Sequence, residues 1–173
     1  EYSEHYTNLY PPYSREAPAY FYANGKHYLF TSGTSGYYPN PSQVCCFQDW
    51  HGEYIDMGDP CIGENSDTTF FGQITSILKP EESDCYIAMA DRWKPTNFGK
   101  WMSKKYYRMI EKAMSSGRHE DLIKPDLTPK VEARLSGKLS HHRENTSISR
   151  YVWLPIEWHE DKPVIRWQDE WRL

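Results

Sequence analysis

A single carboxylate, Glu16, precedes a stretch of uncharged residues that has the composition of a buried strand. Residues Ala17–Tyr22 are apolar or aromatic, and the next charged side chain along the chain is Lys26. Apolar surroundings disfavour the ionised form of a carboxyl group, and general acid catalysis near neutral pH needs a protonated group. Glu16 is therefore a candidate general acid. The alternative is a carboxylate that simply begins a strand, since unusual carboxylates mark functional sites only statistically.

Turn signals divide the chain into two groups of four short strands. The first group is Ala17–Tyr22, Lys26–Thr31, Gln43–Phe47 and Tyr54–Met57, and the second is Gln73–Leu78, Cys85–Asp91, Tyr151–Trp158 and Val164–Trp167. Between the first two strands, Asn24-Gly25 is typical of a tight hairpin turn. The pattern predicts an all-β fold, because successive four-stranded antiparallel sheets form the blades of a β-propeller. A β-sandwich gives the same pattern at this level of detail.

The composition of the 173 residues restricts the class of function, and their number suits one domain of ordinary size. Aromatic residues make up 16% of the chain, with 14 Tyr and 7 Trp. This excess indicates a packed β core or aromatic platforms for a flat ligand such as a sugar ring. The net charge of −4 argues against a nucleic-acid partner, because such proteins neutralise phosphates with Lys and Arg. No apolar run approaches the ~18–20 residues that a membrane span needs.

The cysteine and histidine residues do not have the spacing of a metal site, and no Cys-x-x-Cys motif is present. The four cysteines are Cys45, Cys46, Cys61 and Cys85. We expect them to be small buried apolar side chains, and a disulfide between two of them stays open. His141-His142 has no partner at metal spacing, so we expect neither a metal ion nor another cofactor.

Residues 97–150 interrupt the second group of strands and have a different character. Apolar residues recur at helical spacing over Asn97–Ser116, with Lys and Arg between them, which predicts one amphipathic helix. Gly117 suits the end of that helix. The remainder is polar and contains Pro125 and Pro129, so we expect a loop there. The whole segment is interpreted as a helical and loop insertion in the β fold.

Short segments in a fixed order along the chain form a set that can be compared with known families. They are Arg15-Glu16-Ala17-Pro18-Ala19, the hairpin segment Tyr28–Gly36, Tyr38-Pro39-Asn40, Gly58-Asp59-Pro60-Cys61, Phe71-Gly72-Gln73, Ala88-Met89-Ala90-Asp91-Arg92-Trp93 and Tyr151-Val152-Trp153-Leu154-Pro155. The set resembles glycoside hydrolase family 43, in its branch of exo-β-1,3-galactanases and β-galactosidase-like enzymes. The resemblance spans nearly the whole chain apart from the insertion.

The resemblance implies a five-bladed β-propeller with a central active-site pocket, of which this chain matches about the last two blades. Residues 1–173 are accordingly interpreted as a partial glycosidase propeller domain. In the family, two catalytic aspartates lie upstream of the motif that contains Glu16. None of the 15 residues that precede Glu16 here is an aspartate. We therefore expect that N-terminal blades are missing from this sequence.

The resemblance assigns catalytic roles to Glu16 and Gln73. Glu16 matches the general acid of the family, in agreement with its position before an apolar strand. Gln73 begins a strand 57 residues later, and the first strands of neighbouring propeller blades converge on the central pocket. We expect Gln73 to face Glu16 and to position the attacking water or contact the substrate, because an amide orients water but scarcely accepts a proton. The alternative is a buried glutamine whose amide is bonded to backbone.

Two further groups of residues are candidates for contact with a sugar. The first lies in the loop after the strand at 26–31 and consists of Thr34, Tyr37, Tyr38 and Asn40. The second ends a strand of the second group and consists of Asp91, Arg92 and Trp93. An acid, a base and an aromatic ring in succession suit a sugar platform. For Asp91 and Arg92 a structural ion pair is the alternative.

The resemblance implies an inverting, exo-acting glycoside hydrolase that releases β-linked galactose from a plant-type polysaccharide. Its partner is then an oligosaccharide or polysaccharide, and a secreted or periplasmic location is expected. Two alternatives stay open. One is a β-xylosidase or α-arabinofuranosidase of the same family, and the other is a sugar-binding fragment without catalysis.

Overall fold

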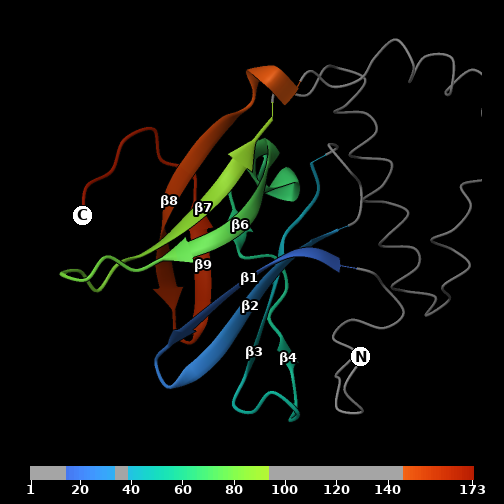
Figure 1. The fold of residues 1–173 in the computed structure, drawn as a ribbon, viewed down its shortest axis with the longest axis vertical. Helices are drawn as coiled ribbons and strands as arrows, with labels where there is room; N and C mark the ends of the chain where they lie inside the picture. The colour runs from blue at the N-terminus through green and yellow to red at the C-terminus, as the bar shows by residue number, and fades with distance from the viewer. Residues whose placement is uncertain (1–14, 34–38, 94–145) are drawn as a thin grey trace, which may run out of the picture.

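The computed structural model describes residues 15–33, 39–93 and 146–173, which form two β-sheets (Figure 1). The first sheet has the order β1-β2-β3-β4, with β1 (Arg15–Ala23), β2 (Lys26–Gly33), β3 (Gln43–Phe47) and β4 (Ile55–Asp56). The second has the order β5-β9-β8-β7-β6, with β5 (Cys61–Ile62), β6 (Gly72–Leu78), β7 (Tyr86–Arg92), β8 (Arg150–His159) and β9 (Lys162–Arg166). Two 3-10 helices are described as well, η1 (Ser66–Phe71) and η2 (Thr146–Ile148).

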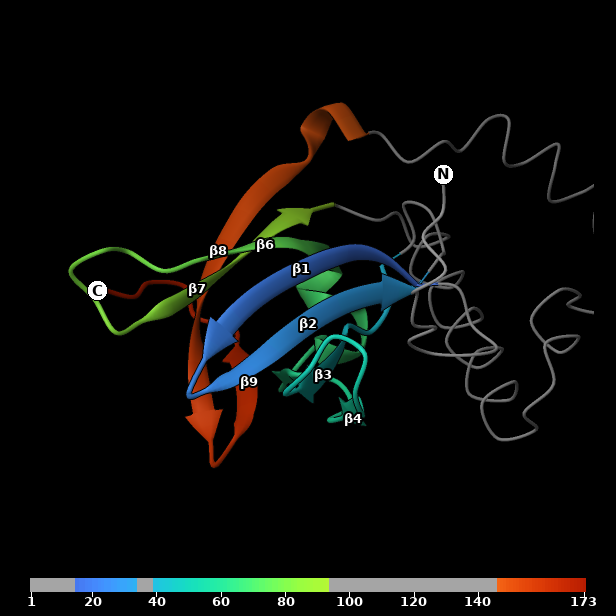
Figure 2. The same ribbon diagram turned by 60° about the horizontal axis from the view of Figure 1, so that its bottom comes forward.

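Each sheet contains an antiparallel meander, in which strands that follow one another in sequence are neighbours. This is the topology of a propeller blade, whereas sandwiches of the immunoglobulin type use Greek-key connections. The first strands of the two meanders, β1 and β6, lie next to each other, as Figure 2 shows. The predicted pair of antiparallel sheets is therefore confirmed, and the number of blades stays a prediction.

Turn chemistry explains why β1 and β2 form a tight hairpin. At the turn, Asn24 and Gly25 have φ angles of 50° and 75°. Positive φ at both central residues is what a two-residue hairpin turn of type I′ requires, and Asn-Gly is its preferred sequence. The turn fixes the register of the two strands, and this register places Glu16 opposite Ser32 at their far end.

The hydrophobic core fills the space between the two sheets. On the side of the first sheet, the ring of Phe21 stacks on Tyr28 and Phe30, with ring centroids 5.1 and 5.5 Å apart. On the side of the second sheet, Ile74 and Leu154 are buried in the same cluster. Because protein interiors are packed as densely as organic crystals, this core holds β1 and β6 in a fixed relative position.

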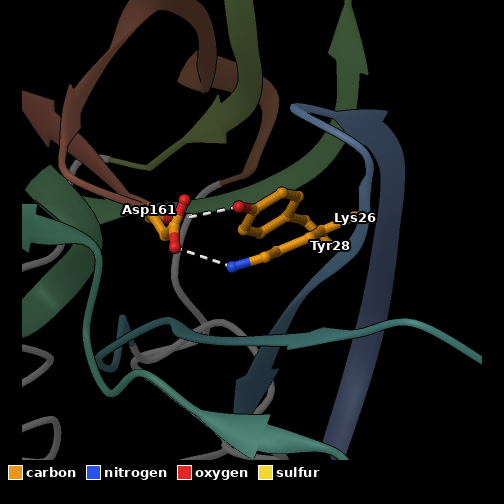
Figure 3. Close-up of polar contacts among 3 residues, drawn as sticks. All are labelled: Lys26, Tyr28 and Asp161. Carbon is orange, nitrogen blue, oxygen red and sulfur yellow. Dashed lines mark hydrogen bonds and ion pairs between the residues drawn. The ribbon is translucent and has the colours of Figure 1, made fainter.

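A polar contact joins the hairpin tips of the two sheets (Figure 3). The Nζ atom of Lys26 lies 2.7 Å from Oδ2 of Asp161, and the Tyr28 hydroxyl donates to the Asp161 backbone oxygen at 2.9 Å. The hydrogen bond to Asp161 raises the pKa of Lys26, and burial raises the pKa of Tyr28 to about 12. Both groups therefore keep their protons, and the contact persists, over the whole physiological pH range.

Replacement of Tyr28 by phenylalanine is expected to lower the free energy of unfolding by about 1 kcal/mol. The ring stays in the core, and only the hydrogen bond to Asp161 is lost. Urea denaturation of the 173-residue chain measures the difference. Tyr22→Phe is the matched control, because the Tyr22 side chain is exposed. An equal loss of stability in both variants would contradict the role of the Asp161 contact.

The sequence-based strands agree with the structure to within two residues at each end, and two elements were not predicted. β5 was not predicted; it pairs in parallel with β9 through Cys61 and Ile165. η1 was not predicted either. The last strand, expected at Val164–Trp167, begins earlier and ends at Arg166, so that Trp167 lies outside it.

The helical insertion expected at 97–150 lies almost entirely outside the described residues. At its end, the described part holds η2 and the first residue of β8. None of the described helices has the length and apolar character that crossing a membrane would require.

Candidate functional site

Polar side chains from three strand ends meet where β1 and β6 lie side by side. The Nε2 atom of Gln73 donates hydrogen bonds to Oε1 of Glu16, at 3.0 Å, and to Oγ of Ser32, at 3.1 Å. Glu16 and Ser32 are partners in the β1–β2 register, and Gln73 lies near the start of β6. The structure thus brings together the two residues expected to be catalytic. Their roles stay predictions.

An irregularity of the β-bulge type follows Glu16 in β1. The register of β1 and β2 shifts between Glu16 and Ala19, and Ala17 has a φ of 49°. Positive φ is rare for a residue other than glycine, and bulges next to functional sites commonly redirect a side chain. Pro18, which follows, has no backbone N–H group to contribute to a ladder. The Glu-Ala-Pro sequence therefore has a local structural effect, which is to interrupt the ladder immediately after the carboxylate.

Two residues fix the ends of the strands that carry Glu16 and Ser32. Arg15 donates from Nε to Oγ1 of Thr31 and from Nη2 to its backbone oxygen, both at 3.1 Å. Asn40 accepts from the Gly33 N–H at 2.8 Å and donates to the Gly33 oxygen at 3.0 Å. Sequence reasoning did not identify the role of Arg15.

The Asn40 side chain is used by the backbone of β2. Only 3% of Asn40 is exposed and its amide binds the Gly33 backbone, and the sugar contact expected of it stays a prediction. A side chain added at Gly33 would meet Asn40 at 3.0 Å, so the two residues fit each other closely. Asn40 therefore positions the end of β2. The other three loop candidates, Thr34, Tyr37 and Tyr38, lie outside the described residues.

The three candidates at the end of β7 differ in their surroundings. Asp91 is the register partner of Gln73 and so lies beside the Glu16 cluster. Arg92 forms no ion pair with Asp91 within the described ranges; instead its Nε donates to the Phe70 oxygen at 3.1 Å. Trp93 is only 8% exposed, and its expected role as a sugar platform stays a prediction. Of the three, Asp91 keeps the position expected for a group near the site.

A buried polar network that sequence reasoning missed lies behind the Asn40 loop. Oγ1 of Thr69 donates to the Asn40 backbone oxygen at 2.8 Å and lies 2.9 Å from Oγ of Ser42. Asp59 accepts from the Cys61 N–H at 2.8 Å. Burial raises the pKa of Asp59 to about 7, and burial also raises the pKa of the Cys61 thiol. The Gly-Asp-Pro-Cys motif was visible in the sequence, but its burial was not.

All four cysteines are free thiols, so the disulfide left open by the sequence does not form in this structure. Cys45, Cys46 and Cys61 are buried, as expected of small apolar side chains, and Cys85 is half-buried. Within residues 15–33, 39–93 and 146–173, no group of three or more His, Cys, Asp or Glu side chains is arranged to hold a metal ion.

Comparison with solved structures relates this arrangement to known proteins. A GH43 β-1,3-galactosidase with galactodeoxynojirimycin matches 92% of this chain with a TM-score of 0.60 and 27% sequence identity. A second GH43 β-1,3-galactosidase matches 92% of the chain with a TM-score of 0.58 and 23% identity. An exo-β-1,3-galactanase from Phanerochaete chrysosporium with β-1,3-galactotriose matches 87% with a TM-score of 0.51 and 20% identity.

The matches cover only part of these proteins. The chain spans 32%, 24% and 23% of their respective lengths. Neither a protein-family model nor a curated protein matches the chain significantly. The structural matches confirm the resemblance to glycoside hydrolase family 43 that the sequence motifs indicated, and they relate the two sheets to a part of the fold of these enzymes.

Proposed function

We propose that this chain, which resembles a part of the GH43 β-1,3-galactosidases, supplies the general acid of a glycoside hydrolase that acts on β-linked galactose. The observation that carries the proposal is the hydrogen bond between Gln73 and Glu16 at the junction of β1 and β6. Support for galactose comes from the identity of 27% with a β-1,3-galactosidase, whose solved structure holds galactodeoxynojirimycin.

In the proposed reaction, protonated Glu16 donates its proton to the glycosidic oxygen as the bond to the leaving sugar breaks. Gln73 holds the Glu16 carboxyl group through Nε2. The Gln73 amide oxygen accepts no hydrogen bond from a described residue, so it is suited to accept one from the attacking water.

The distance between the two groups bears on how the substrate is accommodated. In an inverting glycosidase the acid and the group that handles water are ~6.5–9.5 Å apart, because sugar and water lie between them. Gln73 and Glu16 are in direct contact at 3.0 Å. We therefore expect that a sugar entering the site replaces this hydrogen bond and moves Gln73 away from the acid.

A second candidate function is sugar binding without catalysis. Within the described part of the chain, the contacts of Gln73 and Ser32 include one carboxyl group, that of Glu16. An inverting glycosidase uses two. On this alternative, Glu16 binds a sugar hydroxyl group and the bond is not cleaved.

Release of sugars by the 173-residue chain tests both candidates. The substrates are β-1,3-galactobiose and aryl derivatives of β-galactose, β-xylose and α-arabinofuranose. We expect galactose release from the first two, and at most slow release from the others. Faster cleavage of the xyloside or arabinoside would contradict the galactose assignment. Binding of galactobiose without any cleavage would favour the second candidate.

A further inference from the structure

A cavity of about 610 Å³ lies beside the second sheet, between η1 and the segment that follows β9. Phe70 and Phe71 of η1 line one side, and Arg166 and Trp167 line another. Neither Glu16 nor Gln73 is among its lining residues. Sites for small molecules have volumes of about 300–1,000 Å³, so the cavity has the size of a ligand site that is separate from the Glu16 cluster.

The indole ring of Trp167 is held in place at the cavity. Its Nε1 donates to Oδ1 of Asp169 at 2.8 Å, and the guanidinium carbon of Arg92 lies 4.4 Å from the ring centroid. The Phe70 ring is a further neighbour, with the centroids 5.9 Å apart. Trp167 nevertheless keeps 37% of its surface exposed. A rigid, partly exposed ring of this kind provides a surface on which the apolar C–H face of a pyranose can stack.

The charged groups around the ring favour an uncharged ligand. Arg92 and Arg166 supply two positive charges, and Glu64 and Asp169 supply two negative charges. Arg166 is also paired with Glu157, at 3.2 Å. The positive and negative charges that line the cavity are equal in number, so an anion finds no excess of positive charge there. The guanidinium groups can donate hydrogen bonds to sugar hydroxyl groups, and the carboxylates can accept hydrogen bonds from them.

The backbone that lines the cavity is strained. Asn65, Phe70 and Phe71 have φ angles of 61°, 56° and 65°, which residues other than glycine rarely adopt. The end of β7 holds this conformation, because Arg92 donates to the Phe70 oxygen and the Trp93 N–H donates to the Phe71 oxygen at 2.8 Å. Strain that neighbouring structure maintains is concentrated at ligand sites.

We propose that this cavity is a second sugar-binding site, which takes an uncharged pyranose that stacks on Trp167. The proposal rests on the proposed function for the class of ligand, because the cavity alone does not specify galactose. Its role would be to hold a galactose-containing chain near the Glu16 cluster. The cavity-lining Phe71 precedes Gln73 by two residues, so the two sites share one segment of backbone.

Isothermal titration of the 173-residue chain with β-1,3-galactotriose tests the proposal, and every sample carries Glu16→Gln so that the trisaccharide is bound but not cleaved. We expect the number of bound trisaccharides per chain to fall from two to one in Trp167→Ala. Trp153→Ala is the matched control, because Trp153 is also exposed but does not line the cavity, and it should still bind two. Unchanged binding by Trp167→Ala, or equal losses in both variants, would overturn the proposal.

A second variant, Glu64→Gln, tests the same cavity in case Trp167→Ala fails to fold. Glu64 is exposed, and Glu64→Gln removes only a charge at the rim of the cavity. We expect weaker binding at one of the two sites by several-fold, with an unchanged unfolding curve. If Trp167→Ala does not unfold cooperatively, this variant decides, and unchanged binding by Glu64→Gln then overturns the proposal.

Cleavage assays with Glu16 present separate this proposal from the proposed function. Trp167→Ala should cleave an aryl β-galactoside, which carries one sugar, at the rate of the unmodified chain. If the unmodified chain cleaves the galactoside but Glu16→Gln binds only one trisaccharide, the second site is contradicted and the proposed function is not. If trisaccharide binding depends on Trp167 but no sample with Glu16 cleaves the galactoside, the proposed function is contradicted and the second site is not.

Discussion

Replacement of Glu16 by glutamine is expected to lower the rate of glycosidic cleavage by about 10²–10⁴-fold, the range that general acid catalysis typically contributes. Glutamine has the same shape but cannot donate a carboxylic proton. Sugar binding should change little, because the amide oxygen of the introduced glutamine can still accept the hydrogen bond from Nε2 of Gln73. The measurement is the cleavage rate of aryl β-galactosides that differ in leaving group.

The leaving group distinguishes a general acid from a residue that only binds. A good leaving group such as dinitrophenolate departs without a proton, so Glu16→Gln should affect it far less than an alkyl or sugar leaving group. Ser32→Ala is the control, because it removes a partner of Gln73 and leaves the carboxyl group in place. An equal loss of rate for all leaving groups would contradict the assignment of Glu16 as the acid.

The strands could be predicted because each buries one face against the other sheet. In β1, for example, Ala19 and Phe21 are buried and Tyr20 is exposed; the strand was predicted from its run of uncharged apolar and aromatic residues before a turn signal. The contact between Glu16 and Gln73 also followed, because the topology of consecutive meanders brings their first strands together. That expectation rested on the resemblance to a propeller family, in which the first strands of neighbouring blades converge.

Features that depend on contacts between distant segments could not be predicted. β5 has two residues, and its pairing with β9 joins Cys61 to Ile165, far apart in the chain. Asn40 has the residue type of a sugar-binding side chain, and only the folded structure shows that the Gly33 backbone uses its amide. The direction of Arg92, toward Phe70, is likewise a tertiary effect.

Asp59 gives the second large expected effect, on stability as a function of pH. Burial raises its pKa from 3.8 to about 7; the Cys61 N–H and Lys162 oppose the rise, and Asp67 adds to it. Between these pH values the folded chain holds a proton that the unfolded chain releases. Stability therefore falls as pH rises from 3.8 to 7, and the loss is complete above pH 7.

The variant Asp59→Asn should abolish this dependence, because an amide is uncharged at every pH and its oxygen can still accept from the Cys61 N–H. At pH 8 we expect Asp59→Asn to be more stable than the unmodified chain, by at most about 4 kcal/mol from the size of the pKa shift. At pH 4 to 5 the two should be nearly equal. Urea unfolding across this pH range measures the difference.

The form of the pH profile is the decisive part of this prediction. Asp84→Asn is the control, since the Asp84 side chain is fully exposed and its replacement should change the free energy of unfolding only slightly. If Asp59→Asn raises the free energy of unfolding by the same amount at pH 4.5 and at pH 8, the stabilisation comes from the shape of the side chain and not from its charge. A variant less stable at pH 8 would mean that the Asp59 carboxylate stabilises the fold. Because Asp59 accepts from Cys61 at the start of β5, we expect the short parallel pairing with β9 to be the element most sensitive to this charge.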